Sequence, residues 1–202
     1  MSEIPPPTKK PLNVSDMYQQ MEHRVHIHKK PDTYVGSCEK EIYETYIYNE
    51  DEKKIKLKEI ECPPGWYKCF DELVVNSHDH KKRMEKVIKD NPTGNHKLVN
   101  NIKISITDEG VLEFYNDGDG IHIEYLEKHK MYPVQLIFGT LLSSTNFDDN
   151  EKREWGGRNG YGAKLANIFS EKFIVETVDH FRKKKLIQEF NKNMSIINKP
   201  KI

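Results

Sequence analysis

Residues 156–170 read GGRNGYGAKLANIFS, with four glycines in seven residues that run directly into a segment with a helical pattern. Glycine lets a backbone come close to an anion, and the N–H groups at the start of a helix point outward toward it. Arg158 and Lys164 would add positive charge. The stretch therefore favours a phosphate-binding cradle, although a flexible loop also accounts for such a density of glycine.

Two common nucleotide-binding motifs are excluded by the same stretch. A P-loop needs Lys followed by Ser or Thr directly after its last glycine, whereas Gly162 is followed by Ala-Lys-Leu. A dinucleotide-binding GxGxxG motif starting at Gly160 would need a third glycine where Leu165 stands. Any nucleotide site in this chain must belong to another fold.

The segment upstream, residues 66–90, has the pattern of a long helix with three polar residues on one side. Glu72, Asn76 and Asp79 are spaced i, i+4, i+7, which places them in one narrow stripe. A carboxylate can orient and deprotonate water, and an amide oxygen is a suitable ligand for Mg²⁺. The alternative is an amphipathic helix whose polar face lies in water.

A second glycine motif, NDGDG at residues 116–120, follows a predicted strand. Taken alone it is typical of a turn. It also suits a site where glycines let the backbone approach a flat ligand while a polar side chain binds the ligand's edge.

The remaining elements alternate between hairpins and helices, without the repeating strand–helix–strand order of a parallel sheet. We predict an α+β sandwich: a mixed, mainly antiparallel sheet with helices on one face. The predicted helices cover residues 15–26, 66–90, 133–142 and 163–169, and the predicted hairpins pair 42–48 with 55–60, 101–107 with 111–115, and 173–178 with 185–191.

Composition limits the possible functions. Lys and Arg number 32 and Asp and Glu number 32, so the chain lacks the basic excess of a free-standing nucleic-acid-binding module. Three cysteines without a CxxC pair favour a reducing compartment over a disulfide scaffold. The sequence has neither a run of about 18 apolar residues nor the apolar centre of a signal peptide, so we expect no membrane association and no secretion.

From about Met17 onward the chain resembles the GHKL ATPases, and most of all their eukaryotic-type DNA topoisomerase II branch, which giant DNA viruses also carry. The segments that carry the resemblance are PDTYVGS (31–37), YKCFDELVVNSHDH (67–80), YNDGDGI (115–121), LIFGTLLSSTNFDD (136–149) and GGRNGYGAKLANIFS (156–170). The resemblance implies the GHKL two-layer sandwich, binding of ATP with Mg²⁺, and ATP hydrolysis.

The resemblance also implies roles for individual residues. Glu72 is similar to the general base, Asn76 to the Mg²⁺-binding asparagine, and Asn116 to the residue that recognises adenine. The other positions that match nucleotide contacts are Tyr18, Asp79, Gly118, Gly120, Ser144, Thr145, Asn146, Gly157, Arg158, Asn159, Gly160, Tyr161, Gly162 and Lys164. The chain departs from the family at Ser77, His78 and His80, where relatives have two alanines and an asparagine.

The family's organisation sets further expectations. Residues 1–14 would be an extended arm that straps a homodimer in the nucleotide-bound state, with Tyr18 reaching the partner subunit's nucleotide. Residues 15–202 would be the ATP-binding domain, cut short at its C-terminus, without the transducer and cleavage domains. In the full-length enzyme, ATP-driven dimerisation would gate the passage of one DNA duplex through another, and this segment alone would hydrolyse ATP weakly.

Two alternatives remain open at the level of the sequence. The chain could be another GHKL ATPase, of the chaperone or kinase type, or a nucleotide-binding remnant without turnover. The expected compartment is the nucleus for a cellular eukaryotic protein, or the host cell or virion for a viral one.

Overall fold

The computed structural model describes residues 21–142 and 161–202. Its strands pair, antiparallel throughout, in three sheets. They are β1 (Glu41–Asn49) with β2 (Lys54–Cys62), β3 (Ile102–Ile106) with β4 (Leu112–Asn116), and β5 (Lys172–Asp179) with β6 (Lys184–Asn191) and β7 (Ile196–Ile197).

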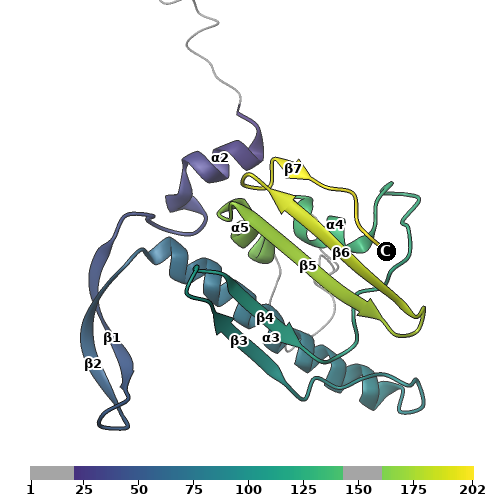
Figure 1. Cartoon of the computed structure of the whole chain (residues 1–202), viewed down its shortest axis with the longest axis horizontal. Coiled ribbons are helices and arrows are strands. Elements are labelled where there is room, and N and C mark those ends of the chain that lie inside the picture. The colour runs from purple at the N-terminus through teal and green to yellow at the C-terminus, as the bar shows by residue number, and fades with distance from the viewer. Residues whose placement is uncertain (1–20, 143–160) are drawn as a thin grey trace, which may run out of the picture.

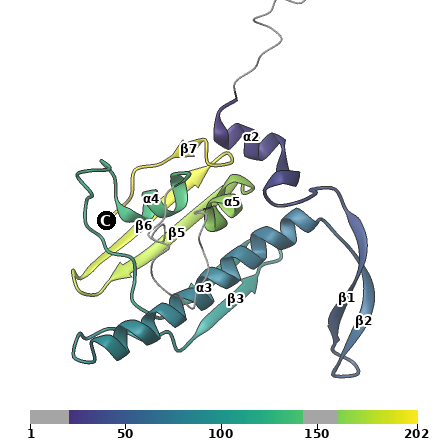
Figure 2. The ribbon, with the colours of Figure 1, turned by 180° about the vertical axis from the view of Figure 1, so that it is seen from behind.

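The helices form a second layer. They are α2 (His23–Lys29), α3 (Pro64–Asp90), α4 (Pro133–Gly139) and α5 (Gly162–Ile168), with a 3-10 turn over Pro31–Thr33. Figure 1 shows β3–β4 and β5–β6 in front of α3, α4 and α5, and Figure 2 shows the same helices from behind. Both views agree on helices covering one face of the strands, which confirms the predicted α+β class.

The core lies between the β5–β6 hairpin and the helices. Along β6 the side chains of Leu186, Gln188 and Phe190 are buried while their neighbours are less so, the period of two expected of a strand with one face inward. Phe190 is fully buried and packs with Leu165 and Ile168 of α5. Burial of each such side chain contributes about 1.5–3 kcal/mol to the free energy of unfolding.

A proline lies at the start of helix α3 and another lies just after its end. Pro64 occupies its first turn, where no N–H donor is needed, and Pro92 follows the C-cap residue Asn91. Between them no glycine or proline interrupts residues 66–90. The helix is therefore continuous over the predicted range.

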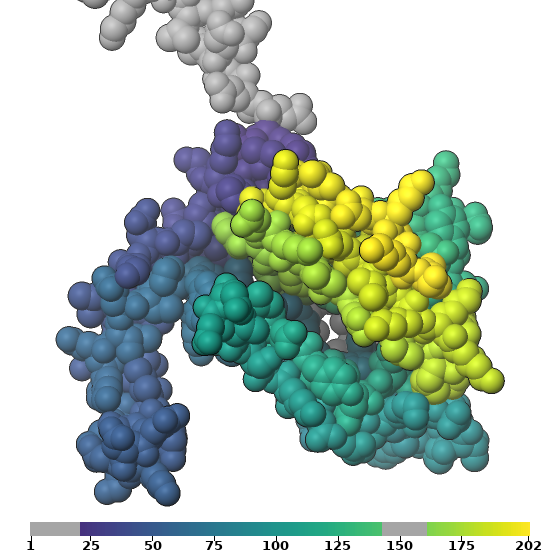
Figure 3. Space-filling model, in the orientation of Figure 1, coloured from purple at the N-terminus to yellow at the C-terminus, as the bar shows by residue number. Residues whose placement is uncertain are grey.

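The β1–β2 hairpin projects away from the two layers, as the space-filling view in Figure 3 shows. Its register pairs Tyr46 with Leu57 and Tyr48 with Ile55, and all four side chains are exposed. The alternating pattern of the sequence thus predicted the pairing of this hairpin correctly.

The segment after β4 joins β5 through side chains. The backbone N–H of Ile121 donates to Thr177 Oγ1 at 2.8 Å, and that of Ile123 donates to Asp179 Oδ2 at 2.9 Å. Side-chain oxygens here take the place that carbonyl oxygens have in a sheet ladder. Because these contacts are made by side chains and not by a backbone ladder, β3–β4 and β5–β6 are separate sheets within one layer.

The largest differences from the predicted boundaries are in α2 and α4. Glu22 is extended (ψ 137°), so α2 begins at His23, and it runs to Lys29, beyond the predicted end at residue 26, where Pro31 limits it. Residues 15–20 of the predicted helix lie outside the described ranges. Helix α4 ends at Gly139, since Thr140 is extended, and not at 142. Strand β7 was not predicted. Within the described ranges, no helix is long and apolar enough to cross a membrane.

Candidate functional site

The polar stripe of α3 (Glu72, Asn76 and Asp79) lies on the side of the helix that faces α5. The Glu72 side chain is 24% exposed, and its Oε1 lies 2.7 Å from Lys68 Nζ. That hydrogen bond raises the pKa of Lys68. Asp79 is 17% exposed on its side chain, whereas Asn76 is exposed. A half-buried carboxylate beside an accessible amide fits a binding site better than a purely solvated face.

Gly162, the first residue of α5, lies directly on this stripe. A Cβ atom built on Gly162 would collide with Glu72 Oε2 and lie 3.4 Å from Glu72 Cδ and 3.6 Å from Asn76 Nδ2. The end of the glycine-rich stretch, the expected base and the expected magnesium ligand are therefore neighbours, although they are about 90 positions apart in the chain. A side chain at position 162 would require the Glu72 carboxylate to move aside.

Lys164 follows Gly162 by half a turn and is only 4% exposed. Burial lowers the pKa of Lys164 to about 8. A buried lysine gains more from a nearby anion than an exposed one, since water no longer stabilises its charge. Among the residues expected to bind phosphate, Lys164 is therefore a buried cation whose charge an anion would stabilise.

The NDGDG motif lies at the other end of the stripe. A Cβ on Gly118 would lie 2.9 Å from His80 Nε2, so this glycine packs against α3 one turn beyond Asn76. The ring of His80 is largely buried, and burial, then Arg83, lowers its pKa. Residues 72 and 80 are about 12 Å apart along a helix axis. Both glycine motifs thus contact one side of α3, with Asn76 and Asp79 between them.

Asn116 ends β4, and its position depends on the next residue. Asp117 accepts hydrogen bonds from the backbone N–H groups of Asn100 and Asn101, at 2.8 and 2.9 Å, and from Asn101 Nδ2 at 2.7 Å. These bonds, led by that from the Asn101 backbone, lower the pKa of Asp117. The loop that presents Asn116 is therefore tied to the segment before β3.

Gly120 has a packing role. A Cβ there would collide with the Val178 carbonyl oxygen and lie 2.7 Å from its carbon and 2.9 Å from Thr177 Oγ1. The room that the missing side chain leaves at Gly120 is filled by strand β5. Strand β5 thus lies close to the Gly120 backbone, where a side chain would otherwise stand.

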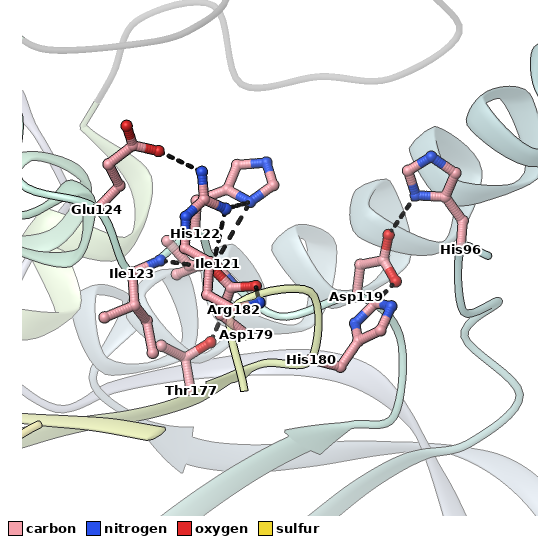
Figure 4. Close-up of polar contacts among 10 residues, drawn as sticks. All are labelled: His96, Asp119, Ile121, His122, Ile123, Glu124, Thr177, Asp179, His180 and Arg182. Carbon is pink, nitrogen blue, oxygen red and sulfur yellow. Dashed lines mark hydrogen bonds and ion pairs between the residues drawn. The ribbon is translucent and has the colours of Figure 1, made fainter. Parts of the chain in front are cut away.

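Two carboxylates that the sequence reasoning passed over anchor the motif on both sides (Figure 4). Asp119 Oδ2 lies 2.6 Å from His96 Nδ1, and Asp119 Oδ1 lies 3.6 Å from His180 Nδ1. The Lys97 backbone N–H also donates to Asp119, at 2.8 Å. Asp119 thereby joins the loop after α3 to the turn after β5. Its position between Gly118 and Gly120 was the one visible signal for it.

Asp179 is the second anchor, and it is 1% exposed. It accepts hydrogen bonds from the backbone N–H groups of Ile123 and Arg182 and from Arg182 Nη1 at 3.1 Å. Burial alone would raise the pKa of Asp179, but these bonds outweigh it and lower the pKa. Arg182 also pairs with Glu124 (Figure 4). The sequence gives no signal for this network, because its members come from distant segments.

Other predicted site residues lie outside the described ranges. They are Tyr18, Ser144, Thr145, Asn146, Gly157, Arg158, Asn159 and Gly160. The arm at residues 1–14 lies outside them as well.

Residues 21–142 and 161–202 hold no group of three or more His, Cys, Asp or Glu side chains that could coordinate a metal ion by themselves. Mg²⁺ bound with a nucleotide needs fewer protein ligands, because water and phosphate oxygens supply the rest. The exposed amide of Asn76 beside Glu72 fits that donor set.

No family model matches the chain. Among curated proteins it is similar to DNA topoisomerase 2 of Candida albicans (44% identity over 196 residues, 96% of this chain and 13% of the relative). It is also similar to DNA topoisomerase 2 of Acanthamoeba polyphaga mimivirus (41% identity over 207 residues, 100% of this chain and 15% of the relative). The chain thus spans about a seventh of the length of these relatives.

Solved structures show the same likeness. The ATPase region of Saccharomyces cerevisiae topoisomerase II matches with a TM-score of 0.84 and 43% identity, over 93% of this chain and 47% of that one. The ATPase and transducer domains of DNA topoisomerase II from Balamuthia mandrillaris match with a TM-score of 0.84 and 35% identity, over 94% and 45%. The 43K ATPase domain of Thermus thermophilus gyrase B shares only the fold (TM-score 0.53, 16% identity, 88% and 33% covered).

Proposed function

The chain is a homologue of the ATPase region of type II DNA topoisomerases over nearly its whole length, and from that premise we propose that it binds ATP with Mg²⁺ against helix α3. The observation that carries the proposal is the meeting of both glycine motifs on one side of α3. Gly162 abuts Glu72 and Asn76, and Gly118 abuts His80.

The polyphosphate of ATP would lie at the Gly162 end of the stripe, and its adenine would lie at the Gly118 end. Lys164 would pair with a phosphate and regain the charge that burial disfavours. Asn76 would hold Mg²⁺, which neutralises phosphate charge when bound. Asn116, fixed by Asp117, would bind the edge of the adenine.

Glu72 would orient and deprotonate the attacking water. Its carboxylate is half-buried and adjoins the Gly162 backbone, so a water between it and the terminal phosphate would be screened from bulk solvent. Lys68 pairs with one oxygen and leaves the other toward Gly162. Hydrolysis by residues 1–202 alone would be slow, because an added positive charge is needed to stabilise the transition state.

We further propose the family's wider role for the longer protein to which such a region belongs. Residues 15–202 would form the ATP-binding domain, and residues 1–14 an arm that crosses to a second subunit when nucleotide is bound. Dimerisation would gate the passage of one DNA duplex through another. The protein would act in the nucleus of a cellular eukaryote, or in the host cell or virion of a virus.

The test is calorimetric titration of the 202-residue chain with a non-hydrolysable ATP analogue, with and without Mg²⁺. We expect binding that requires Mg²⁺ and that weakens about tenfold or more in Asn76→Ala, through the loss of an ion ligand. Lys89→Ala, an exposed change near the other end of the same helix, should bind like the wild type.

A folded chain that binds no nucleotide would overturn the proposal. Binding that is indifferent to Mg²⁺ and to Asn76→Ala would leave a nucleotide site but remove the assigned metal ligand. Mg²⁺-dependent binding of the analogue, together with no release of phosphate from ATP itself by the full-length protein, would instead favour a nucleotide-binding remnant.

A further inference from the structure

Helix α2 meets the start of α5 through a cluster of polar rings. The hydroxyl of Tyr161 lies 3.2 Å from His23 Nε2, and the two rings meet edge to face with centroids 5.6 Å apart. Tyr34 packs against both rings, at 6.1 Å from His23 and 6.0 Å from Tyr161. The Tyr34 hydroxyl in turn lies 3.0 Å from His26 Nδ1. One N-terminal segment, residues 23–34, thus holds a tyrosine from a distant part of the sequence.

Tyr161 is directly followed by the residue that contacts the candidate catalytic stripe. Gly162 lies against Glu72 and Asn76, where a Cβ atom would press on the Glu72 carboxylate. The Tyr161 carbonyl also accepts the first backbone hydrogen bond of α5, from Leu165 N–H at 2.9 Å. Any displacement of Tyr161 would therefore move both the Gly162 backbone and the first turn of the helix that carries Lys164.

We propose that His23 is a positioning residue for the nucleotide site. By holding the Tyr161 hydroxyl, it fixes where Gly162 lies relative to Glu72 and Asn76, and so links the N-terminal helix to the site on α3. The role in nucleotide binding rests on the function proposed above.

The fold itself does not depend on this hydrogen bond. Helix α2 is attached to α5 by buried apolar contacts, in which Ile27 packs in one cluster with Leu165 and Ile168. His23, by contrast, is only partly buried. Replacing His23 should therefore leave α2 in place and release only the Tyr161 hydroxyl.

The variants are chosen to isolate that hydrogen bond. His23→Ala removes one partner, Tyr161→Phe removes the other, and the double variant removes both. His23→Gln keeps an amide that can reach the hydroxyl. His28→Ala is the matched control: a histidine of the same helix that stacks on Phe169, with ring centroids 5.7 Å apart.

Two measurements are made on the full 202-residue chain. The first is the affinity for the Mg²⁺-bound ATP analogue. His23→Ala and Tyr161→Phe should each weaken it about fivefold, the effect of one hydrogen bond, and the double variant should be no weaker than either single variant. His23→Gln should retain wild-type affinity within about twofold.

The second measurement needs no ligand: the hydrogen exchange of the Leu165 amide. His23→Ala should speed this exchange several-fold, and His28→Ala should not. This readout separates the two proposals, because it tests the positioning of Tyr161 even in a chain that binds no nucleotide.

Three results would overturn the inference. One is wild-type exchange at Leu165 in His23→Ala. Another is an equal effect of His28→Ala in both measurements. The third is additivity in the double variant, which would mean that His23 and Tyr161 act separately. If the wild-type chain does not bind nucleotide, the proposed function is overturned, and the exchange measurement still tests the positioning of Tyr161.

Discussion

At the scale of single residues, Glu72 has one oxygen in an ion pair and the other against the backbone. Lys68 Nζ lies 2.7 Å from Oε1, and Oε2 points at Gly162. We expect Glu72→Gln to lower phosphate release from ATP by the full-length protein by about 100-fold or more, because an amide cannot accept the proton of the attacking water.

The affinity of Glu72→Gln for the analogue should stay within about threefold of the wild type, since the side chain keeps its size. Asp71→Asn, a neighbouring acid that also pairs with Lys68, is the control and should hydrolyse ATP normally. Unchanged phosphate release in Glu72→Gln would remove the base assignment.

We predict that Lys164 takes up a proton when the nucleotide binds. The pKa of this buried lysine is lowered to about 8, so at pH 8 about half of the folded chains hold it neutral. A bound polyphosphate favours the charged form and raises the pKa, so binding should take up about half a proton at pH 8 and almost none from this group at pH 6.5. Affinity should accordingly fall as the pH rises above 8.

The uptake can be measured by calorimetry at pH 8 in buffers of different ionisation enthalpy. Lys164→Met should abolish it, whereas Lys172→Met, which removes an exposed lysine paired with Glu189, should not. Equal heats in all buffers for the wild type would show that Lys164 does not meet the phosphates.

At the scale of elements, the predicted hairpins and the long helix agree with the structure because their signals are local. Alternation along β1 and β2, and the prolines that bound α3, depend only on neighbouring residues. The break before α2 was not predicted, because the extended backbone of Glu22 leaves no local pattern. Strand β7 is two residues long, too short for any periodicity.

The contact between the NDGDG loop and β5 gives a prediction at this scale. Gly120→Ala should lower the free energy of unfolding by about 3 kcal/mol, because its Cβ would meet the Val178 backbone, which cannot turn aside as a side chain can. Gly110→Ala, with φ +78° and open space around it, should cost about 1 kcal/mol from backbone strain alone.

Both variants can be compared by urea unfolding, and by the affinity of the folded fraction for the analogue. Gly120→Ala should also weaken binding, since it displaces the loop that presents Asn116. Equal stability of the two variants would mean that the loop shifts freely on β5.

At the scale of the whole molecule, the sequence singled out residues that the fold brings together, but not the contacts that hold them. Glu72, Asn76 and Gly162 stand out by spacing and residue type, and the fold brings them together. Asp119 and Asp179 do not stand out, because their partners His96, His180 and Ile123 are defined only by the folded chain. At Gly120 the close approach of strand β5 could not be read from the sequence, because Thr177 and Val178 lie far along the chain.

The continuous helix α3 has a consequence for how this sequence can diverge. One inserted or deleted residue between Glu72 and His80 would turn the rest of the helix by about 100° and shift it by about 1.5 Å. Gly162 and Gly118 would then face different sides of α3. Point replacements such as those at Ser77, His78 and His80 do not change the orientation of the helix. Side chains along this stretch can therefore diverge, whereas a change in its length would separate the two glycine contacts.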